Sequence, residues 1–167
     1  VDLIVANGSG LTGGTAPSIA VARTTAGKTG FKSPGLISED GAAQDVKENS
    51  KEVRAYGLST PVRKIVTSSD VTMKTTMLET NPVSAAVYHR MSLNGITVTG
   101  GAFTTTEGTF RSRRYAFVVD AVDGLNKIRM VCPNTEVTDR DGKQIKNGEV
   151  IQYGVTLTAY PDSTGVA

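Results

Sequence analysis

Tryptophan is absent from this 167-residue chain, and aromatic residues make up only 5% of it. The core must therefore rest on aliphatic side chains and methionine. A single cysteine, Cys132, excludes a disulfide within the chain and is consistent with folding in a reducing cytoplasm. A zinc site needs three or four His, Cys or carboxylate ligands, and one cysteine with one histidine, His89, argues against it. We expect neither a metal nor a cofactor.

Long apolar runs and a strong net charge are also lacking. No run approaches the roughly 20 apolar residues of a membrane-spanning helix, so we expect no contact with a membrane. The apolar start at 1–6 has no basic flank, which argues against a signal peptide. The formal net charge of +2 is too small to indicate nucleic-acid binding by charge alone.

Threonine is abundant, with 22 residues, and threonine favours strands. Asx-Gly pairs, which supply the positive-φ residues of tight hairpin turns, recur along the chain. With 38% hydrophobic and 20% charged residues, the composition is that of a globular protein. We therefore predict one mainly β domain over 1–167. The pairs are Asn7-Gly8, Asp40-Gly41, Asn94-Gly95, Asp123-Gly124, Asp141-Gly142 and Asn147-Gly148.

Alternating apolar and polar residues predict the strands. The clearest is 150–160, where period-two alternation indicates one buried and one polar face. Residues 115–122 are apolar throughout, which is typical of burial on both faces, and a turn at Asp123-Gly124 joins them to a strand at 127–132. Two further strands, 61–68 and 71–78, are predicted to pair with each other through a connection at Ser68, Ser69 and Asp70.

One short helix is predicted over 82–91. Asn81 is a good N-cap, Pro82 suits the first helical position, and apolar residues follow at spacings of three and four. Residues 7–30 are rich in Gly, Thr, Ser and Ala and are predicted to form a long flexible arm or loop. Residues 161–167 are predicted to form a loose C-terminal tail.

Motifs that resemble catalytic or binding sites are weak. Residues 8–13 match G-x-G-x-x-G, but no helical pattern follows, so a flexible arm is favoured over a dinucleotide site. His89 and Cys132 lack the partners of a nucleophilic triad and are predicted to be structural. Asp139–Gly142 lacks the later ligands of a calcium loop and fits a hairpin turn. We predict that the protein is not an enzyme.

Two charged clusters remain open to interpretation. The acidic cluster fits a strand or loop exposed to solvent. Alternatively, it forms a surface that repels phosphate groups within a Debye length of about 8 Å, so that DNA passes without binding. The basic cluster, close to the 115–122 strand, is suited to bind either nucleic acid or the acidic surface of a neighbouring subunit. The acidic residues are Glu39, Asp40, Asp45, Glu48 and Glu52; the basic ones are Arg111, Arg113 and Arg114.

The order of several short motifs resembles the major tail tube protein of non-contractile siphophages that infect actinobacteria and their relatives. The chain has GLISEDG at 35–41 and LETN at 78–81 directly before the predicted helix. FVVD at 117–120 and the terminal strand VTLTA at 155–159 complete the series. The resemblance covers roughly 34–160. The Gly-rich arm cannot be matched residue by residue, and no appended immunoglobulin-like domain is present.

The resemblance implies a tail-tube-type β-sandwich or half-barrel with one flanking helix. It implies hexameric rings that stack into a tube, through which phage DNA reaches the host. Expected partners are other copies of the chain and the tape measure, tail terminator and distal tail proteins, within a virion assembled in the bacterial cytoplasm. Under this interpretation the acidic cluster lines the lumen and the basic cluster contacts other subunits.

Other functions are kept as alternatives. A carbohydrate- or receptor-binding β-sandwich module usually presents exposed aromatic platforms, for which a chain without tryptophan is poorly equipped. A tube protein of a contractile tail or secretion machine is a structural alternative, and only the motif at 35–41 argues against it.

Overall fold

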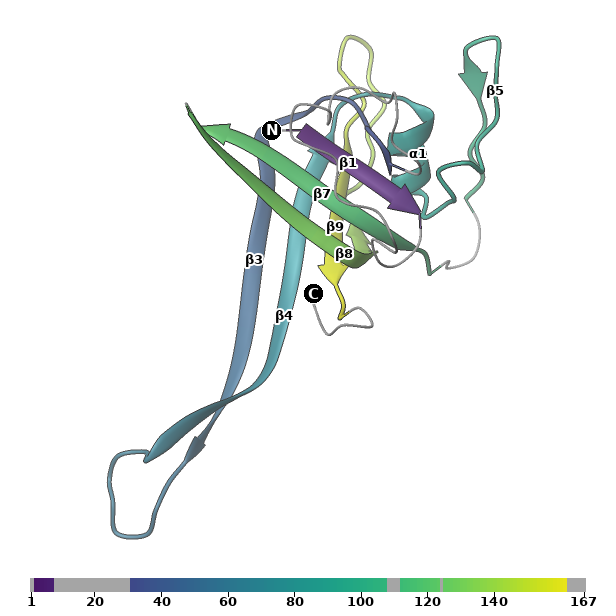
Figure 1. Ribbon diagram of the computed structural model, residues 1–167. Helices are drawn as coiled ribbons and strands as arrows, with labels where there is room; N and C mark the ends of the chain where they lie inside the picture. Colours follow the sequence, from purple (N-terminus) through teal and green to yellow (C-terminus); the bar gives the residue numbers. More distant parts are fainter. Residues whose placement is uncertain (1, 8–30, 108–111, 124, 162–167) are drawn as a thin grey trace.

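The computed structural model describes residues 2–7, 31–107, 112–123 and 125–161, and these are mainly β (Figure 1). The predicted arm, from residue 8 onward, and the tail from 162 lie outside the described residues. The elements are β1 (Asp2–Asn7), β2 (Phe31–Lys32), β3 (Ile37–Val53), β4 (Arg63–Met77), α1 (Pro82–Tyr88), β5 (Val98–Thr99), β6 (Ala102–Phe103), β7 (Arg114–Asp123), β8 (Asn126–Arg140) and β9 (Tyr153–Ala159).

Seven of these strands form one antiparallel sheet in the order β2-β1-β7-β8-β9-β4-β3, and β5 pairs with β6 separately. Figure 1 shows the large sheet as a single, strongly twisted layer with α1 beside it. The predicted mainly β fold with one short flanking helix is confirmed. Of the two predicted forms, a half-barrel describes this single layer better than a sandwich of two packed sheets.

β7 and β8 form the hairpin that the sequence predicts. Asp123 pairs with Asn126 at its turn, and every residue of β7 from Tyr115 to Asp120 is buried. Burial on both faces explains the unbroken apolar run of this strand. β8 extends to Arg140, well beyond the predicted end at 132, because an irregularity in the β7–β8 register near Tyr115 lets pairing continue past Pro133.

The core lies between one face of the sheet and α1. Met73 and Met77 of β4 and Leu157 of β9 are at most 2% exposed, and they pack with the buried side chains of the helix. The Tyr115 hydroxyl donates to the Met91 carbonyl over 2.8 Å, which fixes the chain just after the helix to β7. The predicted apolar face of the last strand is therefore confirmed.

Asn81 caps α1 as predicted. Its side-chain oxygen accepts from the backbone N–H groups of Val83 and Ser84 at 2.9 Å, and Ser84 reaches back to the Asn81 N–H in a capping box. The Asn81 amide also donates to the Pro34 carbonyl over 2.7 Å. The cap therefore joins the helix to the segment that enters β3.

The predicted pairing of 61–68 with 71–78 is wrong. Both stretches belong to the single strand β4, whose partner is β3. The polar residues that suggest a turn face polar residues of β3 instead: Ser69 lies opposite Glu48, and Asp70 lies opposite Lys47. Thr67 is left over between two register positions as a bulge, and its hydroxyl donates to the Asn49 carbonyl over 3.0 Å.

Candidate functional site

The β3–β4 hairpin projects away from the rest of the molecule (Figure 1). β9 pairs with β4 only over Thr72–Met77, so the part of β4 before Val71 has β3 as its sole strand partner among the described residues. An isolated two-stranded ribbon is marginally stable in water. A surface that covers the hairpin would therefore stabilise it.

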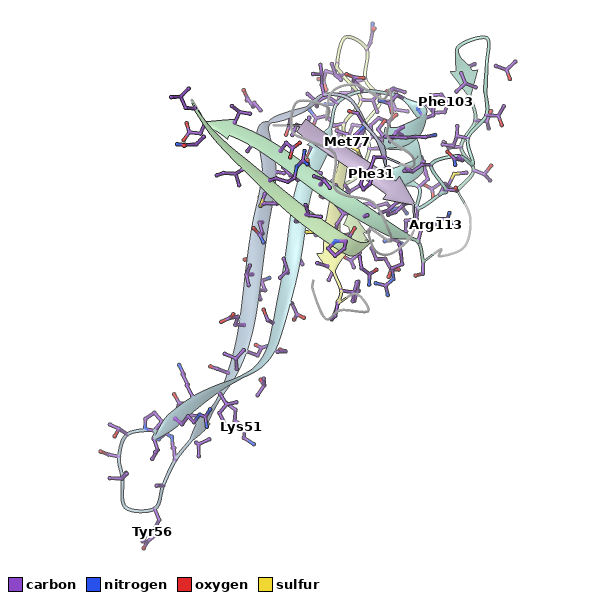
Figure 2. All side chains as sticks on the ribbon, viewed as in Figure 1. Phe31, Lys51, Tyr56, Met77, Phe103 and Arg113 are labelled. Carbon is purple, nitrogen blue, oxygen red and sulfur yellow. The ribbon has the colours of Figure 1, made fainter. Side chains whose placement is uncertain are left out.

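Exposed apolar side chains concentrate on this hairpin. Tyr56 is fully exposed and points away from the molecule at the far end, as Figure 2 shows. The other exposed apolar residues here lie along both strands and around the loop between them. Several large apolar side chains exposed on one projecting element indicate an interaction site. These residues, which the sequence analysis did not single out, are Val46, Val53, Leu58, Val62, Ile65 and Val66.

β3 also ends the sheet. It has β4 on one side, and its other edge has no partner among the described strands. This edge is 17 residues long and offers a row of backbone N–H and C=O groups to another chain. Natural proteins usually shorten, cover or protect such an edge.

The five acidic residues predicted to form one wall all lie on β3, but they do not share one face. Asp45 is paired with Thr72, on the polar face of the sheet, whereas Glu48, three residues later, alternates to the opposite face. Asp45 also forms an ion pair with Lys47 at 3.6 Å, and Glu52 forms one with Arg54 at 2.9 Å. The ribbon therefore carries mixed charge along most of its length.

Glu39 and Asp40 occupy a separate place. Four β3 residues, 38–41, stand opposite the single β4 residue Thr76, and Gly41 takes a positive φ of 69° in this irregular stretch. Here the surface forms an open depression of about 360 Å³. We call it the base groove, and it is lined by Ser38, Glu39, Asp40, Thr76, Leu78 and Gln152.

Over β4 and β9, the sheet face away from the core is polar. Threonines 72, 76, 156 and 158 of β4 and β9 alternate with the buried residues and share this face. Charged side chains of both signs accompany them, including Lys74, which pairs with Asp141 at 3.2 Å. Of the predicted acidic wall, Asp45 lies on this face, and Glu39 and Asp40 meet its border at the base groove beside Thr76.

The predicted basic cluster is only partly described. Arg111 lies outside the described residues, and Arg113 is half-buried (Figure 2). Arg114 has partners within its own chain: Nε lies 3.6 Å from a Glu136 carboxylate oxygen, and the guanidinium lies 4.1 Å from the centre of the Tyr160 ring. A role for these arginines in subunit contacts stays a prediction.

His89 and Cys132 pack inside the molecule. The His89 side chain is 5% exposed, with Nδ1 at 2.8 Å from Glu107 Oε1, an ion-pair distance that lacks the direction of a good hydrogen bond. Burial lowers the pKa of His89; Glu107 opposes this shift, while Lys143 and Arg140 add to it. The Cys132 sulfur lies 3.5 Å from the Met73 sulfur, and burial raises the pKa of the thiol. Neither arrangement provides a reactive nucleophile.

Other kinds of site find no support in the described ranges. No group of three or more His, Cys, Asp or Glu side chains there converges as a metal site would require. In the same ranges, no helix has the length and apolar character needed to cross a membrane. The Gly-rich motif at 8–13 lies outside the described residues.

Comparison with models of known protein families identifies a match. A family model described as phage tail tube protein matches residues 9–166, nearly the whole chain. A search of curated proteins found no match.

Proposed function

The chain belongs to the phage tail tube protein family, a family of structural tail proteins located in the virion, and we propose that it assembles into stacked rings around a DNA channel. The observation that carries the proposal is the projecting β3–β4 hairpin with its exposed apolar side chains. A hairpin with this surface is suited to contact another copy rather than to remain in water.

The open edge of β3 supports closure of a ring. If it pairs with the opposite end of a neighbour's sheet, at β1 and β2, each added copy presents a new edge until rotation closes the ring. The edge strand is then protected in the assembly. Six copies is the ring number that the resemblance to siphophage tail tubes implies.

The polar sheet face is the proposed lumen surface. Threonines with paired charges of both signs offer DNA few unpaired cations, so the duplex slides past without specific binding. Asp45 lies on this face and adds some repulsion at short range. Glu48 and Glu52 alternate to the opposite face of β3, so a lumen position for them requires that ring formation turn this part of the strand toward the channel. Glu39 and Asp40 lie apart from them, at the base groove.

The type of phage is inferred from the resemblance of the sequence motifs. We propose a non-contractile siphophage tail of the actinobacterial type, assembled in the host cytoplasm. The tape measure protein then lies in the lumen, and the tail terminator and distal tail proteins contact the two ends of the tube.

Negative-stain microscopy and sedimentation of purified protein over a range of concentrations test self-assembly. We expect rings or hollow filaments above a threshold concentration. Substituting serine for Tyr56, Leu58 and Val62 is expected to raise that threshold at least tenfold without unfolding the monomer. Val98→Ser, at an exposed valine of the separate β5–β6 hairpin, serves as the control.

Two results would contradict the proposal. One is a wild-type protein that stays monomeric at every concentration. The other is a triple serine variant that assembles as readily as the wild type, because the exposed apolar side chains of the hairpin would then have no part in assembly.

A further inference from the structure

The two ends of β3 carry opposite charge. We call residues 51–64 the hairpin tip; it holds the cations Lys51, Arg54, Arg63 and Lys64 against one carboxylate, Glu52. Glu52 pairs with Arg54, whereas Arg63 and Lys64 are exposed and have no ion pair within the described ranges. The tip therefore presents uncompensated positive charge beside its apolar side chains.

The base groove presents the complementary surface. Glu39 and Asp40 are both exposed and, within the described part of the chain, have no cationic partner. A second depression shares Gln152 with the base groove and adds Glu149, whose carboxylate pairs with Lys146 at 3.4 Å. The uncompensated negative charge here therefore comes from Glu39 and Asp40. Val150, an exposed apolar residue, lines the second depression. Leu36 and Ile145 are also exposed and lie close in sequence to the lining residues.

We infer that the hairpin tip of one copy docks into the base groove of a second copy, with Arg63 and Lys64 against Glu39 and Asp40. This inference rests on the proposed self-assembly and names the surfaces that meet. Opposite charges at the two sites favour tip-to-groove contact, and like charges disfavour tip-to-tip and groove-to-groove contact. The contact is therefore head-to-tail and repeats along one direction.

The position of the two surfaces suits such a repeat. Figure 1 shows the start of β3 and the loop after β8 at one end of the molecule and the hairpin tip at the other. Asp40 and Val53, the register partner of Arg63, are separated by 53 − 40 = 13 residues of β3. At about 3.3 Å per residue, the backbones of the two sites are at most about 43 Å apart. Successive copies are therefore displaced by about this distance or less, apart from the reach of the paired side chains.

A single tip is too small to hold two copies together. Stable interfaces bury about 800 Å² on each partner, and a loop of this size supplies only part of that area. Several tips engaging at once would raise the effective affinity by orders of magnitude. We therefore expect docking to be strong only between copies already joined side by side, so that stacking follows ring formation.

Charge reversal tests the contact. The tip variant carries Arg63→Glu with Lys64→Glu, and the groove variant carries Glu39→Lys with Asp40→Lys. Each alone places like charges at every tip-to-groove contact, so we expect at least a tenfold higher threshold for filaments. A variant that carries all four substitutions restores every contact with the charges exchanged, because its acidic tip meets the basic groove of the next copy. The control is Asp123→Lys, an exposed site at the β7–β8 turn.

Circular dichroism first establishes that each variant is folded, and microscopy then compares the two double variants with the fourfold variant. Filaments that form from the fourfold variant but from neither double variant support the contact, with an axial repeat near or below about 43 Å. Double variants that each assemble like the wild type overturn it, as does a folded fourfold variant that fails to assemble. A wild-type protein that never assembles overturns the proposed function itself, which separates the two failures.

Discussion

β3 and β4 run through two different environments. Within the body of the molecule, β9 pairs with the edge of β4, and the residues of α1 share a core with one face of this strand. Met73, Thr75 and Met77 are nearly inaccessible to solvent there. Beyond β9, Ile65 and Val66 of the same strand are 42% and 55% exposed. Both halves of β4 contain residues that favour strands, and both are hydrogen-bonded to β3. They differ in whether further elements of the same chain supply a covering surface.

The body of the molecule and the projecting hairpin are therefore expected to have different roles. The body has its own core and is expected to fold as a monomer, because the stabilisation of a domain comes mainly from buried apolar area. The hairpin contributes little to that core. Its apolar side chains are expected to contribute their burial free energy only when a second copy covers them.

The largest effect is expected from truncating a core aromatic. Phe117 of β7 is 1% exposed, and Phe117→Ala should lower the free energy of unfolding by about 3–5 kcal/mol. Ile65→Ala in the hairpin should change it by less than about 0.5 kcal/mol. Urea denaturation of unassembled protein measures both values. Equal losses would mean that hairpin and body share one core in the monomer.

Ion pairs should show the same contrast. Arg129 Nε and Nη2 lie 2.6 and 2.7 Å from the two carboxylate oxygens of Asp120, which is 2% exposed. Asp120→Ala leaves the guanidinium without its partner and should cost about 3 kcal/mol. Glu52→Ala breaks the exposed pair with Arg54 in the hairpin and should cost less than about 1 kcal/mol. A double-mutant cycle with Arg129→Ala isolates the coupling, and a coupling near zero would contradict the structural role of the pair.

A smaller effect is expected from pH, and only in the body. Burial lowers the pKa of His89 below its ordinary value of 6.5, so the folded state binds fewer protons than the unfolded chain below that pH. The unfolding free energy should therefore fall as the pH drops below about 6.5. Glu107 adds a loss at lower pH: partial desolvation raises its pKa, but Arg140 and His89 hold it below the ordinary 4.5.

Urea denaturation at pH 7.5 and at pH 5.5 measures the contribution of His89. His89→Gln should lose less stability between these values than the wild type does. If the two proteins respond equally to pH, then burial does not perturb the histidine.

The same contrast explains which parts of the fold the sequence could predict. The β7–β8 hairpin, β9 and α1 have their patterns set by local burial and by turn or cap residues such as Asn81, and these elements are confirmed. Their ends were less predictable: β8 runs to Arg140 instead of 132, and α1 ends at Tyr88 instead of 91. β4 was divided wrongly, because Ser68, Ser69 and Asp70 look like a turn when their partners on β3 are unknown. Pairing across a long hairpin is a non-local property.

The candidate site was less predictable than the fold. The acidic residues were placed together by their closeness in sequence, but alternation and the irregular stretch at Gly41 distribute them over different surfaces. The apolar hairpin residues were missed, since an exposed Val or Ile in a strand has the same pattern as a buried one. The available signal was an apolar loop, with Tyr56, Leu58 and Val62, between two strongly polar strand segments.

Amide hydrogen exchange of the protein before and after assembly tests the division between body and hairpin most directly. In the unassembled protein we expect residues 47–66 to exchange fast while β7 and β9 are protected, and in filaments we expect the hairpin to gain protection and the body to change little. A hairpin already protected in the monomer, or one that stays unprotected within filaments, would contradict the claim that another copy of the chain completes it.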